Sequence, residues 1–547
     1  MTGFNPRFVL NDPSTQTPSA QWLEWVEQQY NVPEGHYLID LLGEVAPFEQ
    51  AQIEIAQKAT ELIREVRQHP QPFHAVDELL LEYGLDTEEG VILMCLAEAM
   101  MRVPDTATLD ALIQDRLGAA HWEEHLGKSD SFLVNASSWG LLLTGKVSSF
   151  QALKDSPFNS FKRLAARLGE PLVRSALQQA MRIMSKQFVV GRNLPEALEN
   201  SRQNRDKGYT YSFDMLGEAA LTDQDAKRYF NSYLRAIETL GENRNQWNGK
   251  APAPSISIKL SALHPRYEQA HEETVLNELS ATVEKLVAKA RAVEVALTID
   301  AEEMDRLELS LKVFERVLKG ATAKGWGQFG LAVQAYSKRA LAVLGFLNAL
   351  GREAGCTIPV RLVKGAYWDS EIKHTQLLGL KDYPVFTRKE NTDVSYLVCA
   401  RFLLDGVTNQ WLHPQFATHN ALTVASILHL SEKLARFEFE FQRLHGMGEA
   451  LYDVLLKKNP TDVRVYAPVG PHKDLLPYLV RRLLENGANS SFVHRLVDAK
   501  TPVEQLIASP IAKARANTHA KHSNIPLPPN LFGPARINSL GLNLNCG

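Results

Sequence analysis

The stretch YTYSFDML (residues 209–216) is the first of eight short runs rich in β-branched and aromatic residues, and the pattern of the sequence changes here. Such runs are typical of β-strands. The other seven are SISIKL (255–260), VALTIDAE (295–302), FGLAVQAY (329–336), PVRLVKGAY (359–367), QFATHN (415–420), FEFQRLHG (439–446) and VRVYAPVG (463–470). Several are almost continuously apolar, as expected of strands that are buried on both faces of a parallel sheet.

Amphipathic helix patterns lie between these runs, as in DQDAKRYFNSYLRAIETL (223–240), ELSLKVFERVLKG (308–320) and RALAVLGFLNAL (339–350). Eight strands, each followed by a helix, over roughly 280 residues match the count and the size of a (β/α)8 barrel. An open doubly wound sheet is the alternative. A glycine-rich fingerprint normally follows its first strand, and DMLGEAALT (214–222) does not fit G-x-G-x-x-G. The sequence therefore favours a TIM-like barrel.

The residues before the barrel are predicted to be helical, and the clearest patterns are APFEQAQIEIAQKATELIREV (46–66), TEEGVILMCLAEAMMRV (87–103) and PLVRSALQQAMRIMSKQ (171–187). After residue 500, proline, asparagine and glycine are typical of a linker or flexible tail. The predicted fold class is α/β, a (β/α)8 TIM-like barrel preceded by an all-helical region. The predicted domains are a helical arm (1–85), a helical domain (86–204), the barrel (205–500) and a linker or tail (501–547).

Composition is typical of a soluble globular protein, with 45% hydrophobic and 22% charged residues. The net charge of −4 gives no argument for nucleic acid, so no nucleic-acid partner is expected. Four widely spaced cysteines indicate neither a zinc site nor disulfides, and they fit a reduced cytoplasmic compartment. The N-terminus lacks a secretory signal, and the most apolar run, VILMCLAEAMM (91–101), is shorter than the ~20 residues of a membrane span. Peripheral membrane attachment stays open.

Polar and aromatic residues gather at the predicted C-terminal ends of the strands, where TIM barrels carry their chemistry. They are Asp214, Glu218, Lys259, Asp300, Glu302, Glu303, Gln334, Tyr336, Arg361, Lys364, Tyr367, Trp368, Thr418, His419, Asn420, Gln442, His445 and Tyr466. Each of them alone fits a structural role. Together they predict a site, because a lysine and an aspartate on neighbouring strands would form a buried ion pair that is costly without a function.

The stretch YLVRRLLENG (478–487) follows the eighth predicted strand. At helical spacing, Tyr478, Arg481, Arg482 and Glu485 share one face. That face fits a solvated helix surface, and it equally fits a pair of guanidinium groups that bind an anion. Because the helix would begin at the mouth of the barrel, we interpret the two arginines as a carboxylate clamp.

Three kinds of chemistry remain open from the residues alone. A lysine at a strand end permits Schiff-base chemistry. A carboxylate-rich mouth permits a divalent-metal enzyme, but no ligand spacing supports one and no metal site is predicted. A flavin or phosphate cofactor would suit the basic loop FTRKENTD (386–393) together with Trp368.

Long motifs resemble one known family. SIKLSAL, LTIDAEE, VRLVKGAYWDSEIK, FTRKENTDVSY, ATHN, EFQRLHGMGE, VYAPVG and YLVRRLLENGANSSFV resemble, in this order, the proline dehydrogenase domain of bacterial proline utilization A. The likeness covers roughly residues 205–500, and FLVNASSWGLLLTGKV before it is similar to the helical segments of that family. It implies a flavoprotein in proline catabolism that oxidises L-proline to Δ1-pyrroline-5-carboxylate, with FAD as cofactor and a membrane quinone as electron acceptor.

The resemblance also implies roles for single residues. The implied substrate-binding residues are Arg481, Arg482, Tyr367, Tyr466, Tyr478 and Leu444, with Glu218 holding Arg481 in an ion pair. Lys259, Asp300 and Arg361 are the implied catalytic residues, the last of them near flavin N5. The implied FAD-binding residues are Asp300, Gln334, Arg361, Val363, Lys364, Gly365, Trp368, Thr387, Arg388, Lys389, Thr418, His419, Asn420 and Glu485.

The sequence departs from the family in two places. Some members begin with a ribbon-helix-helix DNA-binding domain, and MTGFNPRFVLNDPSTQ (1–16) lacks that pattern, so no repressor activity is expected. Members normally continue into an aldehyde dehydrogenase domain. The stretch PNLFGPARINSLGLNLN (529–545) resembles the start of that domain. We expect a proline dehydrogenase portion without the second activity. A regulatory barrel without turnover and a Schiff-base lyase are the competing functions.

Overall fold

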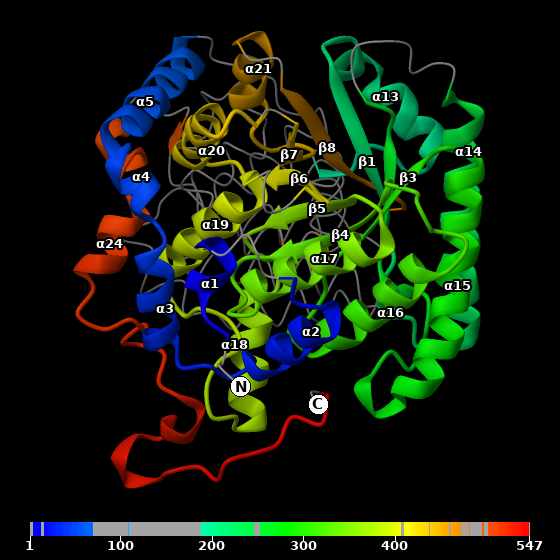
Figure 1. Cartoon of the computed structure of the whole chain (residues 1–547). Coiled ribbons are helices and arrows are strands. Elements are labelled where there is room, and N and C mark those ends of the chain that lie inside the picture. The colour runs from blue at the N-terminus through cyan, green and yellow to red at the C-terminus, as the bar shows by residue number, and fades with distance from the viewer. Residues whose placement is uncertain are drawn as a thin grey trace, which may run out of the picture.

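The computed structural model describes residues 4–11, 16–68, 105, 108, 188–244, 252–405, 410–436, 438–458, 461–471, 478, 481, 495–496 and 501–545. Its centre is a closed barrel of eight parallel strands in chain order (Figure 1). The strands are β1 (Tyr209–Met215), β2 (Ser255–Ile258), β3 (Ala296–Ile299), β4 (Phe329–Gln334), β5 (Ile358–Val363), β6 (Leu412–Ala417), β7 (Glu440–Leu444) and β8 (Asp462–Val469). The predicted (β/α)8 barrel is thereby confirmed.

Each predicted run overlaps one observed strand, and the largest shift of a strand start is at β6. This strand begins at Leu412, three residues before the predicted start at Gln415. His413 and Pro414 interrupt the β-rich pattern, since proline lacks the N–H that a central strand uses. Both residues nevertheless pair in register with β5.

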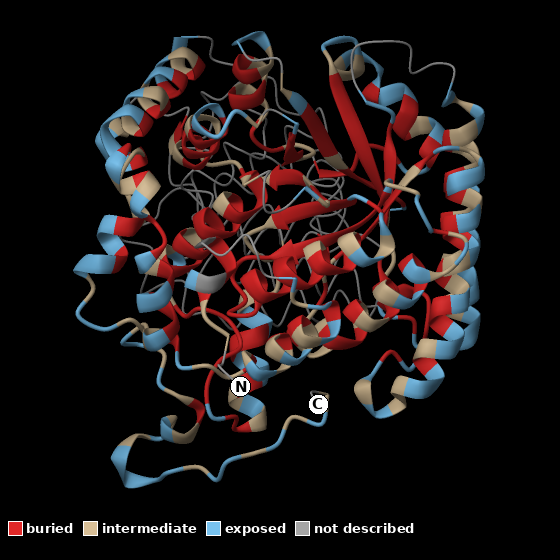
Figure 2. Ribbon diagram, viewed as in Figure 1, coloured by how far each residue is buried: buried red, intermediate tan, exposed pale blue. Residues whose placement is uncertain are grey.

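Helices surround the barrel and turn their buried faces towards it (Figure 2). They are α14 (Asp223–Glu242), α15 (Glu272–Ala292), α16 (Leu307–Lys319), α17 (Ala340–Ala354), α18 (Trp368–Leu378), α19 (Lys389–Leu404), α20 (Ala421–Lys433) and α21 (Glu449–Lys458). Short 3₁₀ turns lie at Leu260–Ala262, Gln269–His271, Met304–Arg306, Pro528–Asn530 and Gly533–Ala535. A helix follows β5 as predicted, but this strand is followed by two helices, α18 and α19.

The N-terminal helices pack on the outside of the barrel. They are α1 (Pro6–Asn11), α2 (Ser19–Gln28), α3 (Glu34–Gly43), α4 (Ala46–Gln50), α5 (Gln52–Gln68) and, just before β1, α13 (Leu194–Asp206). The predicted helix 46–66 is thus two helices that meet at Ala51. A Cβ on Gly345 of α17 would lie 2.4 Å from the ring of Trp22, so this glycine lets α2 approach closely. The predicted helices 87–103 and 171–187 lie outside the described residues.

Residues 501–545 run back over the molecule. They include α23 (Val503–Leu506) and α24 (Pro510–Ala516) and are otherwise largely irregular, as their composition indicates. Lys521 forms an ion pair with Asp382 (2.5 Å), and the amide of Asn543 donates to Asp305 (2.7 Å). The sequence did not predict this docking. Within the described ranges, no helix is long and apolar enough to cross a bilayer.

Glu34 at the start of α3 joins the N-terminal helices to the barrel. Its buried carboxylate accepts hydrogen bonds from Thr387 N (3.0 Å), Thr387 Oγ1 (2.8 Å) and Asn391 Nδ2 (2.7 Å). We expect Glu34→Ala to lower the free energy of unfolding by about 2–4 kcal/mol, because three buried donors lose an acceptor. Urea denaturation would measure this loss. Asp40→Ala, at an exposed position of the same helix, is the control, and equal losses in the two variants would contradict the prediction.

Candidate active site

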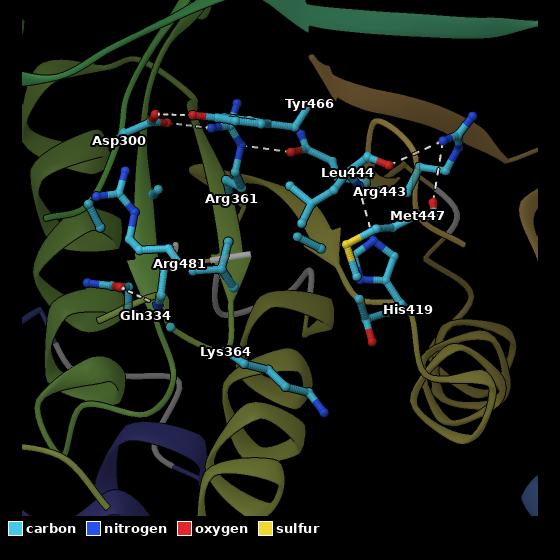
Figure 3. Close-up of a pocket in the computed structure, with 18 of the residues that line it drawn as sticks. Asp300, Gln334, Arg361, Lys364, His419, Arg443, Leu444, Met447, Tyr466 and Arg481 are labelled. Atoms are coloured by element: carbon cyan, nitrogen blue, oxygen red, sulfur yellow. Dashed lines mark hydrogen bonds and ion pairs between the residues drawn. The ribbon is translucent and has the colours of Figure 1, made fainter. Parts of the chain in front are cut away.

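A cavity of about 1330 Å³, including its open mouth, lies at the C-terminal ends of the strands (Figure 3). Most of the residues that the sequence assigned to a site line it. They are Lys259, Asp300, Gln334, Arg361, Val363, Lys364, Gly365, Tyr367, Lys389, Thr418, His419, Asn420, Leu444, Tyr466, Tyr478 and Arg481. The strand-end argument therefore predicted which side chains meet, and their individual roles remain predictions.

Three residues that the resemblance assigned to FAD do not line this cavity. Trp368 Nε1 donates to the carbonyl of Phe386 (2.8 Å), and Arg388 Nε donates to the carbonyl of Lys521 (3.1 Å). Thr387 is bound to Glu34 through its backbone and its side chain. The geometry does not support direct cofactor contact by these three side chains, because the terminal segments of the chain bind Thr387 and Arg388, and the backbone of Phe386 binds Trp368.

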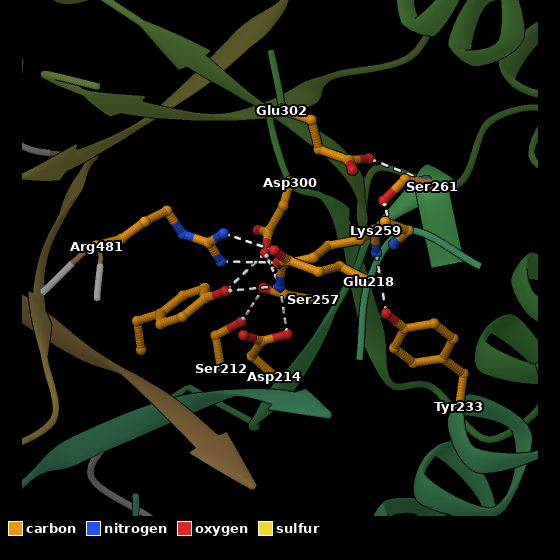
Figure 4. A network of polar contacts seen from close by, with 12 residues as sticks. Ser212, Asp214, Glu218, Tyr233, Ser257, Lys259, Ser261, Asp300, Glu302 and Arg481 are labelled. Carbon is orange, nitrogen blue, oxygen red and sulfur yellow. Dashed lines mark hydrogen bonds and ion pairs between the residues drawn. The ribbon is translucent and has the colours of Figure 1, made fainter. Parts of the chain in front are cut away.

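Arg482 and Glu485 lie outside the described residues. Glu218 does not line the cavity itself, but it reaches the cavity through Arg481. The two side chains form a bidentate ion pair with distances of 2.5 and 2.7 Å (Figure 4). Burial opposes ionisation of Glu218, but the hydrogen bonds and charge of Arg481 hold the pKa of this carboxyl below its usual value. The guanidinium of Arg481 also lies 5.0 Å from the centre of the Tyr367 ring.

A buried charge cluster forms the floor of the cavity, with Lys259 at its centre. The ammonium of Lys259 lies 2.7 Å from Asp214 and 3.2 Å from Asp300, and Tyr466 donates to Asp300 at 2.6 Å. Burial alone would lower the pKa of Lys259, but the two carboxylates raise it well above its usual value. Lys259 is therefore a charged ammonium. A Schiff-base lysine needs a neutral amine, so this geometry argues against that alternative.

Arg361 is fixed by groups from several strands. Its Nη1 donates to Asp300 Oδ1 (2.7 Å), and its Nη2 donates to the hydroxyls of Ser212 (3.1 Å) and Ser257 (3.0 Å). Its Nε donates to Gln442 Oε1 (2.7 Å). A guanidinium with all of these partners presents a fixed positive charge to the cavity.

Three residues of the site had no predicted role. Asp214 and Gln442 were recognised as polar strand ends, and a lysine–aspartate pair on neighbouring strands was expected, but the contact of Gln442 with Arg361 was not. Arg443 was missed, since it reads as an ordinary strand residue. It is buried, lines the cavity and lies 4.8 Å from the centre of the Tyr209 ring.

The other side of the cavity carries an excess of positive charge. Lys364 is paired with Asp393. Burial lowers the pKa of Lys389, and the carboxylate of Asp393 opposes this shift, whereas the charges of Lys364, Lys513 and Arg495 lower the pKa further. An anionic group bound here would relieve the repulsion among these cations. The two lysines therefore suit an anionic ligand.

The backbone of residues 363–366 also lines the cavity. Gly365 has φ +139°, and a Cβ at this position would lie 2.4 Å from the ring of Tyr336. Only glycine fits such a turn without strain. Gln334 supports the turn, because its Oε1 accepts from Ala366 N (3.3 Å) while its Nε2 donates to the carbonyl of Glu302 (2.8 Å).

Glu371 on α18, beside the active-site strands, predicts a pH dependence of stability. Burial raises its pKa to about 8, and the charges of Asp305 and Glu303 add to the shift. An acid whose pKa is raised by folding stabilises the fold fully only below its unfolded pKa, and this stabilisation is lost as pH rises towards 8. Glu371→Gln should therefore be more stable than the wild type by roughly 2–4 kcal/mol at pH 8.5 and equally stable near pH 4.5. Thermal unfolding across this pH range measures the effect, and a constant difference would contradict it.

Comparison with known proteins places the chain among enzymes of one kind. The family model "Proline dehydrogenase" matches residues 197–495. Bifunctional protein PutA of Salmonella typhimurium is 48% identical over 481 residues, which cover 86% of this chain and 36% of that protein. Bifunctional protein PutA of Rhizobium meliloti is 47% identical over 534 residues, which cover 96% of this chain and 43% of that protein. The chain thus spans about two fifths of the length of these relatives.

Solved structures agree with the barrel and with its N-terminal surroundings. A crystal structure of a proline utilization A variant from Bradyrhizobium japonicum has 46% sequence identity and a TM-score of 0.72. The match covers 94% of this chain and 52% of that one.

One expectation about partners is contradicted. The family model "DNA-binding domain of Proline dehydrogenase" matches residues 75–188, which lie almost wholly outside the described residues. The prediction of no nucleic-acid partner rested on the net charge of the whole chain, which averages over its segments. The missing ribbon-helix-helix pattern concerned only residues 1–16. Neither the net charge nor this pattern bears on residues 75–188, which match the DNA-binding domain.

Proposed function

The chain belongs to the proline dehydrogenase family, and on this premise we propose that it oxidises L-proline to Δ1-pyrroline-5-carboxylate with FAD as its cofactor. One observation carries the proposal. A single cavity is lined by Arg481, by the firmly held guanidinium of Arg361 and by Lys389, whose ammonium is repelled by nearby cations. These groups suit a small carboxylate substrate beside a large anionic cofactor.

The substrate's carboxylate would bind Arg481. A guanidinium recognises a carboxylate through paired hydrogen bonds, and Glu218 fixes its direction. The ring of proline would then lie between apolar and aromatic walls that exclude water and fix its orientation. The walls proposed are Tyr367, Leu444, Tyr466 and Tyr478.

Burial at the floor favours the reactive form of the substrate. A hydride leaves the carbon next to a neutral amine more readily than the carbon next to an ammonium. Burial lowers the pKa of an amine because it disfavours the charged form, while the cations Lys259 and Arg361 are balanced by Asp214 and Asp300. Asp300 is not available as a base, because its oxygens already accept from Arg361, Lys259 and Tyr466.

FAD fits the remaining space by the chemistry of the donors. Lys364 and Lys389 would hold its diphosphate, and Arg361 and Gln334 would lie beside the flavin. FAD bound in this way would supply the acceptor for the hydride that proline loses, and the positive charge of Arg361 would favour its reduced form.

We extend the proposal to the fate of the electrons. They would pass to a membrane quinone, and this transfer would bring the chain to the membrane surface as a cytoplasmic, peripheral protein. This part rests on the resemblance to the family alone.

A visible absorption spectrum tests the proposal. The purified chain should show flavin bands, and anaerobic L-proline should bleach them, whereas D-proline should not. Proline oxidation is contradicted if the bands persist in excess L-proline. FAD dependence is contradicted if the protein stays colourless after incubation with FAD.

A further inference from the structure

A chain of buried side chains runs beneath the cavity and ends at Arg361. Arg464 of β8 binds Glu440 of β7 with two hydrogen bonds of 2.7 and 2.9 Å. Glu440 Oε1 accepts from Gln442 Nε2 (2.7 Å), and Gln442 Oε1 accepts from Arg361 Nε (2.7 Å). Arg361 in turn donates to Asp300, as Figure 3 shows.

The direction of the Gln442 amide is fixed by its two neighbours. Its NH₂ group faces the carboxylate of Glu440, and its carbonyl faces the guanidinium of Arg361. A rotated amide would place oxygen against the carboxylate and NH₂ against the guanidinium. Both contacts would be repulsive and would lose buried hydrogen bonds.

The base of this chain is rigid. Arg464 is buried, and its Nη1 also donates to the carbonyl of Tyr211 (3.3 Å) and to the hydroxyl of Ser255 (3.2 Å). It therefore ties Glu440 to strands β1 and β2 on the far side of the β7–β8 pair. Glu440 cannot turn away without leaving a buried cation unpaired.

Gln442 is also the partner that completes the contacts of Arg361. The two terminal nitrogens of Arg361 bind Asp300 and two serine hydroxyls, and Gln442 alone accepts from Nε among the hydrogen bonds of the described residues. Without Gln442, only the two terminal nitrogens of the guanidinium would be held, and its Nε would lose its hydrogen-bond acceptor. The neutral amide of Gln442 also lies between the carboxylate of Glu440 and the guanidinium of Arg361, and it keeps these two charges apart.

We propose that Gln442 is a positioning residue for the reaction, which holds the guanidinium of Arg361 in its catalytic orientation and is itself held by the Glu440–Arg464 ion pair. The inference rests on the proposed function, in which Arg361 lies beside the flavin. Gln442 would thus act on the reaction through Arg361, and the Glu440–Arg464 ion pair that supports Gln442 lies beneath the cavity.

The first variant is Gln442→Leu, tested in the flavin-loaded protein. We expect kcat to fall about 10- to 100-fold, as for a misplaced catalytic group, with little change in KM for proline. The midpoint reduction potential of the bound flavin should also fall, because Arg361 stabilises the reduced form less well. Wild-type values of both kcat and potential in this variant would overturn the proposal.

Gln415→Leu is the matched control. Gln415 is also a buried glutamine of the barrel, it pairs in register with Arg361, and its Oε1 has no hydrogen-bond partner among the described residues. We expect a much smaller effect on kcat and potential than in Gln442→Leu. Equal effects would overturn the proposal, since they would indicate a general disturbance of the barrel.

Gln442→Asn tests the position even if Gln442→Leu does not fold. This variant keeps a neutral amide at the site, and Glu440 keeps its ion pair with Arg464. The shorter side chain cannot contact both Glu440 and Arg361, so kcat and the potential should fall as in Gln442→Leu. A folded, flavin-loaded Gln442→Asn variant with wild-type kcat and potential would overturn the proposal. A wild type that is not reduced by proline would instead contradict the proposed function.

Discussion

Arg481→Met should weaken proline binding by about 2–4 kcal/mol, or roughly 30- to 700-fold in Kd, because a charged hydrogen-bonding group is lost from a desolvated site. Arg481 lines the cavity, and its side chain is mostly buried against Glu218 and Tyr367. Methionine keeps much of the apolar stem and removes the charge. The flavin content should not change, because Lys364, Lys389 and Arg361 are untouched.

The measurement is the dependence of the anaerobic flavin reduction rate on proline concentration, and the concentration of loaded protein is taken from the flavin absorbance. Arg306→Met is the control. Arg306 is another arginine near the mouth, paired with Glu302 and Glu303, but it does not line the candidate cavity. An Arg481→Met variant with the affinity of the wild type would show that the clamp assignment is wrong.

The barrel could be predicted because its signal is local and repeated. A parallel strand covered by helices must be apolar at almost every position, and eight such runs with helices between them leave few architectures. Two details differ from the prediction, and both differences have local causes. Pro414 is untypical of a strand, so the first residues of β6 were not predicted. The second helix after β5 leaves the pattern of the strands unchanged, so the strand count did not indicate it.

The site could be predicted as a set, because the ends of parallel strands meet at one rim of a barrel. The partners within the set could not. Lys259 lies between β1 and β3, and the sequence does not say how its charge is shared between Asp214 and Asp300. Gln442 looked like one more polar strand end, since its role depends on the direction of an amide.

The segment at residues 386–391, which leads into α19, was the least predictable part. Its Thr387 and Arg388 suited a cofactor by residue type, but they bind Glu34 and the backbone of Lys521. These contacts join segments that lie more than a hundred residues apart. Every residue has a backbone carbonyl, so the sequence could not indicate that the carbonyl of Lys521 is the partner of Arg388.

The floor of the cavity predicts the largest effect on stability. Lys259→Met should lower the free energy of unfolding by about 3–5 kcal/mol, because it removes the cation between two buried carboxylates. Arg361 remains bound to Asp300, so Asp214 becomes the uncompensated charge. Chemical denaturation at pH 7 measures the loss.

The matched rescue is Lys259→Met with Asp214→Asn. The second substitution removes the uncompensated charge of Asp214 and should recover most of the stability. The single variant Asp214→Asn should not gain stability, because Lys259 then loses one of its two carboxylate partners. The single variant Lys259→Met should also regain stability as pH falls. Its Asp214 would have a pKa raised by burial, and an acid with a raised pKa destabilises the fold only where it must ionise. If Lys259→Met lost the same free energy at pH 5 and pH 8, and the double variant recovered nothing, the ammonium would not be what holds these two carboxylates in the barrel.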